Sequence, residues 1–330
     1  MRTSSRPRAV TPRTTPGPRT NLPADDPLVI AVVGPTASGK SDLALRVAEM
    51  VGGEVVSTDA MQLYRGMDIG TAKLPVAERR GVPHHQIDVL DVTDDATIAR
   101  YQREARVSID DIRARGLHPV IAGGSGLYVR AALDHLEIPP TDPDVRARLE
   151  GEAEERGSAA TYAVLFERDP VAAQRIGRHN VRRLVRALEV TEITGRPFSA
   201  TMPERRHLHP TLMIGLRPPR ELLDERIVAR VAQMWRDGLI DEVKGLVPQG
   251  IRDGRTASRA LGYAQALAEI DGTMSEADAQ AETAQMTRRY ARRQESWFRP
   301  DPRIVWFDPS AEGALDDAIA LVKQTSADNG

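Results

Sequence analysis

Residues 28–41 read LVIAVVGPTASGKS, a short apolar run followed at once by a glycine-rich turn. The run from Leu28 to Val33 is rich in β-branched residues and continuously apolar, which predicts a strand buried on both faces. The turn fits the pattern G-x-x-x-x-G-K-[ST], which has odds of roughly one in a hundred of arising by chance in a chain this long. Helical spacing from Ser41 to Val51 follows, so the motif lies between a predicted strand and a predicted helix.

A turn of this kind is suited to binding phosphate groups. Its glycines let backbone N–H groups curl around an anion, and the helix N-terminus adds positive potential. Lys40 would supply a mobile cation, and the Ser41 hydroxyl could ligate Mg²⁺ as a cofactor. The alternative is an ordinary glycine-rich turn between a strand and a helix. We expect a di- or triphosphate to bind at Gly34, Pro35, Thr36, Ala37, Ser38, Gly39, Lys40 and Ser41.

The rest of the chain alternates predicted strands with predicted helices. Strands are expected at 55–59, 87–90, 119–122, 212–216 and 304–307, and long helices at 95–115 and 275–298. Such alternation gives right-handed βαβ units and a mostly parallel sheet. Residues 139–210 differ, because they show helical patterns and no convincing strand. We predict an α/β fold with a P-loop NTPase-like core and an inserted all-helical domain. The expected divisions are a disordered tail at 1–27, the first part of the core at 28–138, the insert at 139–210, and the completion of the core with C-terminal helices at 211–330.

Composition excludes several classes of protein. The 330 residues contain no cysteine, which excludes a disulfide scaffold, a Cys-ligated zinc site and thiol catalysis. No apolar run approaches the roughly 18 residues that span a bilayer. No apolar segment of a secretory signal is present, so we expect a cytoplasmic protein. A net charge of −2 excludes a globally basic nucleic-acid coat but permits a local basic groove.

Two polar segments follow predicted strands, at the edge where open α/β sheets bind ligands. Asp59 comes after the second predicted strand and could hold Mg²⁺ or act as a general base; a helix cap or turn aspartate is the alternative. Ser125 lies in Gly123-Gly-Ser-Gly126, where glycines permit close approach of the backbone and the hydroxyl can donate a hydrogen bond. A simple tight turn is as good an interpretation of that segment.

Arginines gather in two places. Residues 287–299 contain five arginines with interleaved aromatics, and five more lie between Arg175 and Arg186 with no acidic residue among them. Phosphodiester binding is one explanation. Pairing with acids elsewhere is the other, although two clusters in one near-neutral chain favour nucleic acid. Arg226 and Arg230 lie four residues apart on a predicted helix and could reach one anion.

Taken together, these motifs resemble the tRNA dimethylallyltransferases, also called tRNA isopentenyltransferases. The resemblance covers about residues 28–307. Its most specific part is the string D-x-x-Q-x-Y-R-G-M-D-I-G-T-A-K from Asp59 to Lys73. The other matching segments are GPTASGKS at 34–41, PHH at 83–85, GGSGLY at 123–128, RALEV at 186–190 and RRQESW at 292–297. The chain departs from the family pattern at Ala60, where serine is usual, and at Ser125, where threonine is common.

The resemblance implies transfer of a dimethylallyl group from its diphosphate to N6 of the adenosine immediately 3′ of the anticodon in tRNA. It implies that Asp59 is the base, that Arg230 contacts phosphate, and that Ser125 touches the phosphate or the acceptor adenosine. The core and the insert would clamp the anticodon stem-loop. The implied RNA-binding residues are Asp59, Ala60, Met61, Gln62, Ser125, Arg146, Arg182, Arg183, Leu184, Val185, Arg186, Arg259, Ala260, Leu261, Gly262, Tyr263 and Ala264.

Other functions remain open at this point. A P-loop small-molecule or nucleoside kinase would explain the phosphate loop but not the arginine clusters. A prenyltransferase acting on free adenine nucleotides would not need the basic insert, and an RNA-binding nucleotide switch would not need Asp59. We expect a monomer, because a clamp around one stem-loop does not need a second subunit. His84 and His85 lack a third metal ligand at suitable spacing, so we interpret them as structural or pocket-lining.

Overall fold

The computed structural model describes residues 26–201 and 205–328. The predicted tail at 1–27 therefore lies almost wholly outside the described residues. Six parallel strands form one sheet in the order β3-β2-β4-β1-β5-β6. The strands are β1 (Val29–Val33), β2 (Glu54–Ser57), β3 (His84–His85), β4 (Pro119–Gly123), β5 (Thr211–Leu216) and β6 (Ile304–Phe307). The predicted α/β fold with a mostly parallel sheet is confirmed.

Both faces of strand β1 are covered, as its sequence predicts. Its alternate residues enter two different hydrophobic clusters: Val29, Ala31 and Val33 in one, Ile30 and Val32 in the other. Helices α1 (Lys40–Val51) and α11 (Ala314–Asp328) contribute to the second cluster. The first cluster is built by α2 (Ile98–Ala114), α3 (Gly126–Leu133), α7 (Arg220–Arg236), α8 (Leu239–Leu246), α9 (Tyr263–Ile270) and α10 (Glu276–Phe298). Within the described part of the chain, no helix is long and apolar enough to span a membrane.

One predicted strand is wrong. The segment Ile87–Leu90 is irregular, and the edge strand β3 lies just before it at His84–His85. Gln86 and Asp88 have φ values of 59° and 57°, in the left-handed region that an extended strand cannot contain. Within this segment the Asp88 carboxylate accepts a hydrogen bond from Lys73 at 2.6 Å.

Two long helices begin directly after their N-terminal capping residues. Helix α2 begins at Ile98 rather than at Asp95, because the Thr97 side chain accepts a hydrogen bond from the Arg100 N–H and caps it. Helix α10 begins at Glu276 after Ser275, whose hydroxyl accepts from the Asp278 N–H. The short 3₁₀ turns are η1 (Val76–Arg79), η2 (Phe198–Thr201), η3 (Val247–Gln249) and η4 (Ala257–Arg259).

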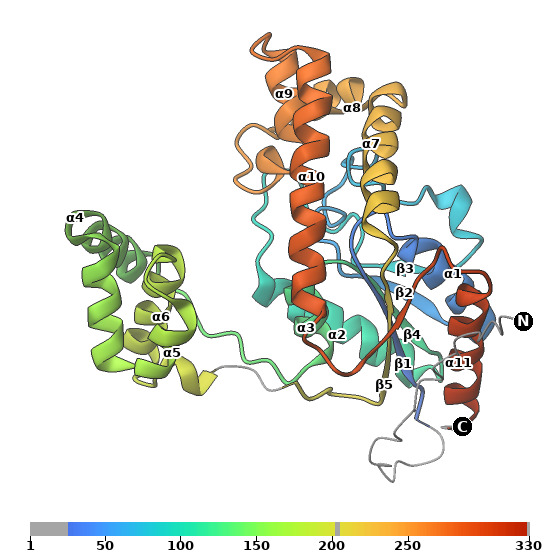
Figure 1. The fold of residues 1–330 in the computed structure, drawn as a ribbon, viewed down its shortest axis with the longest axis horizontal. Helices are drawn as coiled ribbons and strands as arrows, with labels where there is room; N and C mark the ends of the chain where they lie inside the picture. The colour runs from blue at the N-terminus through green and yellow to red at the C-terminus, as the bar shows by residue number, and fades with distance from the viewer. Residues whose placement is uncertain (1–25, 202–204, 329–330) are drawn as a thin grey trace, which may run out of the picture.

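Between β4 and β5 the chain leaves the sheet and forms a separate helical lobe. This lobe consists of α4 (Pro143–Arg168), α5 (Pro170–Ile176) and α6 (Val181–Thr194), which share a hydrophobic cluster of their own. Helix α4 is kinked at Gly157, where φ is 80°. Figure 1 shows the lobe standing away from the body, to which it is joined by the connection after α3 and the connection before β5. These connections meet where Asp134 pairs antiparallel with His207.

A candidate active site at the phosphate loop

The phosphate loop joins β1 to α1 at the carboxyl edge of the sheet. Gly34, Ala37 and Gly39 all have positive φ, which curls the backbone between strand and helix. A Cβ on Gly34 would lie 2.6 Å from the Leu216 carbonyl oxygen, so this position requires glycine. The helix begins at Lys40 with an acidic residue, Asp42, in its first turn. The loop therefore has the backbone geometry that a phosphate group needs.

Lys40 lies deep in this loop. Its Nζ donates to the Pro35 carbonyl oxygen at 3.2 Å. Burial lowers its pKa to about 8, against an opposing effect of the nearby Asp59 carboxylate, while Arg230 lowers it further. A buried ammonium whose nearest hydrogen-bond partner is a neutral carbonyl is poorly compensated, so an incoming anion would stabilise it.

Arg230 of helix α7 approaches the loop from the opposite side. Its guanidinium lies 3.5 Å from the Thr36 hydroxyl, and burial together with Arg226 lowers its pKa. Arg230 lines the same cleft as Lys40 and Ser41, whereas Arg226 does not. The expectation that Arg230 is the better placed of the two arginines agrees with this geometry.

Asp59 lies on the other wall of the cleft, after strand β2. One carboxylate oxygen accepts from the Met61 N–H at 2.9 Å, and its own N–H donates to Ser57. The second carboxylate oxygen has no hydrogen bond to any of the described residues. The Ser57 hydroxyl also donates to the Gln62 amide oxygen at 3.1 Å, so Gln62 is fixed beside Asp59. One oxygen of Asp59 is thus anchored and the other is available to a ligand.

The cleft between these groups has a mixed lining. Lys40, Asp59 and Arg230 supply its charges, and Thr36, Ser41, Ser57, Gln62, Thr71 and His84 add polar side chains. Its apolar members are Val55, Ala72, Leu74, Ile87 and Ala122. A ligand that combines a charged diphosphate with a short hydrocarbon suits such a lining.

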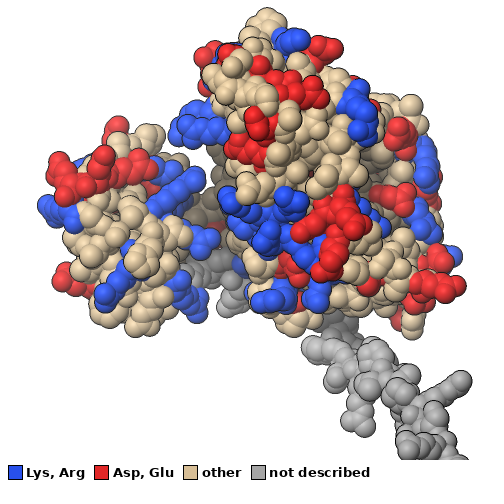
Figure 2. Space-filling view, turned by 45° about the horizontal axis from the view of Figure 1, so that its top comes forward, with Lys and Arg blue, Asp and Glu red and all other residues tan. Residues whose placement is uncertain are grey.

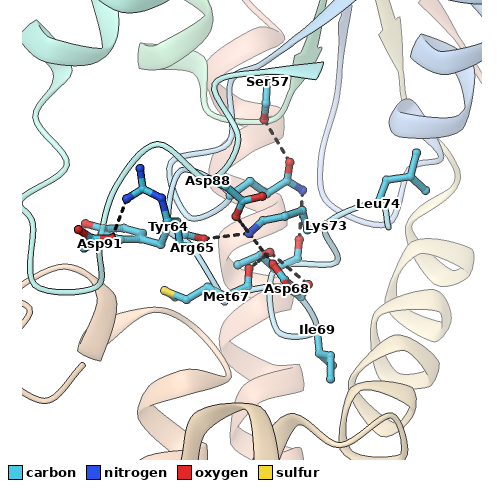
Figure 3. Close-up of polar contacts among 12 residues, drawn as sticks. Ser57, Tyr64, Arg65, Met67, Asp68, Ile69, Lys73, Leu74, Asp88 and Asp91 are labelled. Atoms are coloured by element: carbon cyan, nitrogen blue, oxygen red, sulfur yellow. Dashed lines mark hydrogen bonds and ion pairs between the residues drawn. The ribbon is translucent and has the colours of Figure 1, made fainter. Parts of the chain in front are cut away.

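The segment after Asp59 is held in place by a buried lysine. Figure 3 shows Lys73 at the centre of this network. Its Nζ donates to Asp68 and Asp88, both at 2.6 Å, and to the Tyr64 carbonyl at 2.9 Å, and the side chain is only 3% exposed. The Asp59–Lys73 string therefore combines residues that face the cleft with residues that fold the loop.

Gln294 supports the phosphate loop, although the sequence motifs assign it no role. It lies within the arginine-rich segment at 287–299, yet it is 4% exposed. Its Oε1 accepts from the Thr36 N–H at 2.9 Å, and it also packs so closely on Gly124 that a Cβ there would lie 2.2 Å from its Nε2. Gln294 of α10 thus braces both glycine turns. The two bonded residues lie 258 positions apart, so no local signal could reveal the contact.

Ser125 lies at the start of helix α3 and does not line the cleft. Gly123, two residues earlier, does. The Ser125 side chain makes no capping hydrogen bond to its own helix. Its predicted contact with phosphate or adenosine stays a prediction.

The predicted RNA-binding residues of the lobe fall into two groups. Arg146 and Arg186 both pair with Glu189, which is fully buried, at 2.6 and 2.9 Å. Arg182 and Arg183 are exposed, and their side chains make no ion pair with a described residue. Leu184 and Val185 are buried in the cluster of the lobe, so their side chains pack inward and do not face a ligand.

The predicted residues 259–264 also separate by burial. Arg259 is exposed, while Ala260 and Tyr263 are buried. The Tyr263 hydroxyl donates to Glu242 at 2.5 Å, and the other oxygen of Glu242 accepts from the backbone N–H groups of Asp68 and Ile69. Tyr263 thereby supports the loop that carries Asp59 rather than the cleft itself.

A Mg²⁺ ion fits the donors of the cleft. No three His, Cys, Asp or Glu side chains gather as a metal site in residues 26–201 and 205–328. The Ser41 hydroxyl makes no hydrogen bond to a described residue, and Asp59 has a free oxygen. This sparse oxygen set suits an ion that takes most of its ligands from phosphate and water. His84 and His85 bond to the Val82 carbonyl and to Glu54 respectively.

Comparisons with known proteins agree with this geometry. Residues 62–301 match the family model described as IPP transferase. A tRNA dimethylallyltransferase of Kineococcus radiotolerans is 58% identical over 90% of this chain and 94% of its own, and that of Thermobifida fusca is 58% identical over 90% and 95%. The crystal structure of a tRNA isopentenylpyrophosphate transferase from Bacillus halodurans has a TM-score of 0.68 and 37% identity, over 92% of this chain and 97% of its own. A eukaryotic dimethylallyltransferase acting on tRNA has a TM-score of 0.79 and 26% identity, over 92% of this chain and 80% of its own. This chain therefore belongs to the IPP transferase family of tRNA dimethylallyltransferases.

Proposed function

We propose that this chain transfers a dimethylallyl group from dimethylallyl diphosphate to N6 of the adenosine immediately 3′ of the anticodon in tRNA, releasing diphosphate. The observation that carries the proposal is the cleft itself. It brings Lys40 and Arg230 together at the phosphate loop, includes Asp59 with one carboxylate oxygen available, and has apolar side chains in the same lining.

The phosphate loop serves the leaving group. Its backbone N–H groups, Lys40 and Arg230 bind the diphosphate and stabilise the charge that grows on it as the carbon–oxygen bond breaks. Ser41 would hold Mg²⁺, which when bound neutralises part of that charge. The apolar side chains of Leu74 and Ile87 shield the allylic carbon from water.

Asp59 serves the acceptor. The adenine N6 forms a bond to the first carbon of the dimethylallyl group and loses a proton, which Asp59 accepts. Gln62, fixed by Ser57, lies beside it and can bond the edge of the base. The target base must leave its stack to reach this carboxylate, and an unpaired loop makes that inexpensive.

The separate helical lobe is proposed as the inserted domain, residues 139–210, that holds the anticodon stem-loop against the body. Figure 2 shows Lys and Arg side chains on both sides of the gap between lobe and body. Exposed Arg182 and Arg183 on the lobe and exposed Arg259 on the body are suited to phosphate contacts. One lobe and one body suffice for one stem-loop, so we propose a monomer, and we propose that it acts in the cytoplasm.

One assay tests the reaction. The protein is incubated with Mg²⁺ and labelled dimethylallyl diphosphate, with unmodified tRNA, tRNA in which the target adenosine is replaced by inosine, or AMP. Label is expected only in the unmodified tRNA, because inosine lacks the N6 amine. Label in AMP would indicate a free-nucleotide prenyltransferase. A parallel incubation with ATP and candidate small acceptors tests the kinase, for which phosphate would be transferred and dimethylallyl would not.

A further inference from the structure

The outer face of helix α10 carries an aromatic side chain that the mechanism above does not use. Only two aromatic side chains among the described residues are exposed, Phe166 and Trp297, each to 41%. Phe166 stacks on Tyr162 within the lobe, with ring centroids 5.9 Å apart. Trp297 contacts no other ring in the described part of the chain, and its indole N–H has no hydrogen bond there. One exposed apolar residue is ordinary by itself, so its surroundings decide what it means.

The indole is held at the start of helix α3, directly after Ser125. A Cβ on Gly126 would lie 3.0 Å from three atoms of Trp297, close enough that a larger residue would have to displace the ring. Along the chain, Gly126 follows the turn that Gln294 braces against the phosphate loop. Trp297 is therefore a fixed aromatic surface beside the active site, positioned by packing on one side and open to solvent on the other.

The same face of α10 is basic and not neutralised. Arg289, Arg293 and Trp297 lie four residues apart and share one stripe of the helix. Both arginines are exposed, and neither forms an ion pair with a described residue. The one acid between Thr287 and Arg299 is Glu295, which lies 3.8 Å from Arg217. Aromatic and cationic side chains in one stripe are the combination that binds single-stranded nucleic acid, by stacking and by phosphate contact.

We propose that Trp297 is a stacking platform for a nucleobase that flanks the target adenosine in the RNA loop. The inference rests on the proposed function. Extrusion of the adenosine removes a stacking partner from each of its neighbours, and the indole beside the Ser125 turn replaces one of them. Trp297 is a positioning residue: it stabilises the loop with the adenosine extruded and takes no part in bond formation.

The test is a thermodynamic cycle between the protein and the RNA. Wild type and Trp297→Ala are titrated with three anticodon stem-loops: the intact RNA, one abasic at the nucleotide 5′ of the target adenosine, and one abasic at the nucleotide 3′ of it. With intact RNA, Trp297→Ala is expected to weaken binding roughly 5- to 150-fold, the range for loss of one stacked base. With the abasic RNA that lacks the stacked base, the two proteins should bind alike, because the partner of Trp297 is already gone.

Matched variants separate stacking from charge and from misfolding. Trp297→Phe keeps an aromatic face and should retain most of the affinity. Arg293→Ala, one turn away, should flatten the slope of log Kd against log salt by about 0.7 to 0.9, whereas Trp297→Ala should leave that slope unchanged. Unchanged affinity of Trp297→Ala for dimethylallyl diphosphate shows that the active site is intact.

Two outcomes would overturn the proposal. One is wild-type affinity of Trp297→Ala for intact RNA. The other is a loss of the same size with the intact and both abasic RNAs, which would mean that Trp297 contacts no flanking base. Label transfer by the wild-type protein is measured first. If the proposed function is wrong, the wild-type protein transfers no label. If only this inference is wrong, the protein transfers label, but the effect of Trp297→Ala does not depend on which base the RNA lacks.

Discussion

Lys40 couples diphosphate binding to pH through its burial. The folded protein holds the pKa of its ammonium at about 8, below the ordinary 10.5, so the charge that binds the anion is lost as pH rises through about 8. We expect the Kd of dimethylallyl diphosphate to be nearly constant below that pH and to rise by up to about tenfold per pH unit above it. Calorimetric titration between pH 6.5 and 9.5 measures this. Lys40→Arg should flatten the profile, because arginine stays protonated; an equally steep profile in that variant would exclude Lys40 as the source.

Asp59→Asn keeps the shape of the side chain but accepts no proton. Single-turnover transfer should fall roughly 10²–10⁴-fold, the usual contribution of a positioned general base. Stem-loop affinity should change little, because phosphate contacts dominate such interfaces. The rate is measured across a Mg²⁺ titration. If Asp59 acted only by holding the ion, high Mg²⁺ would restore the rate of the variant, and full restoration would refute its role as base.

Gln294→Ala removes the side chain that braces the phosphate loop. It removes the acceptor of the partly buried Thr36 N–H, and such a hydrogen bond contributes about 0.5–1.5 kcal/mol. We expect a lower Tm and weaker diphosphate binding, measured by thermal denaturation and by titration. Gln285→Ala, at an exposed position of the same helix, is the matched control and should change neither quantity. Equal behaviour of the two variants would show that the brace is dispensable.

At the scale of a helix, the arginines of α6 divide into two roles, and each role predicts a different defect. Arg182→Ala with Arg183→Ala should flatten the salt slope of stem-loop binding by about 1.4 to 1.8, if each loses one phosphate contact, and leave Tm unchanged. Arg186→Ala should lower Tm instead. It removes one partner of the buried Glu189 and frees the Pro139 and Pro140 carbonyls that Arg186 now binds. Salt titrations and melting curves on both variants check this. A triple variant would mix the two effects.

Helices and strands were predictable where local sequence dominates. The run at 28–33, the phosphate loop and the Ser275 cap each carry their signal within a few residues. Strand β3 was misplaced, because an apolar run does not reveal that Gln86 and Asp88 adopt positive φ, or that Asp88 pairs with Lys73 fifteen positions earlier. Nothing in the sequence indicated that Arg186 has partners. Its contacts with Glu189 and the Pro139 carbonyl form only in the folded lobe.

For the whole molecule, Asp134 joins the two connections of the lobe to the body. Its side chain is 1% exposed and accepts from Arg303 at 2.7 Å and Arg130 at 2.9 Å, and its backbone bridges to His207. Asp134→Asn removes a buried negative charge that Arg130 and Arg303 both contact, while Arg303 keeps its ion pair with Asp301, so the two connections should be held less firmly. We expect faster limited proteolysis at the connections and a lower Tm.

The control for that variant is Asp317→Asn, an exposed carboxylate of α11 with no ion pair to a described residue. It should be cleaved at the wild-type rate. If Asp134→Asn were also cleaved at that rate, the ion-pair cluster would not be what secures the lobe.

The sequence was enough to predict the reactive side chains of the candidate site, but not the residues that hold those side chains in place. Lys40, Asp59 and Arg230 could be named from motif and spacing, and the structure brings them into one cleft. The side chains that hold them there could not, since Gln294 bonds to Thr36 across 258 positions of chain, and Glu242, which Tyr263 holds, bonds to Ile69 across 173. Contacts between residues so far apart in the chain form only in the folded protein, so no local sequence pattern reveals them.

The position of β1 in the sheet also affects how the chain is made. Strand β1 lies between β4 and β5, and β5 follows the lobe in sequence. Roughly 90 residues separate the end of β4 from β5. A ribosome adds about 5–20 residues per second, so one edge of the apolar strand β1 stays uncovered for roughly 4–18 seconds during synthesis. An exposed edge of that kind pairs readily with other chains. We therefore expect translation that stops before Thr211 to yield a fragment that aggregates.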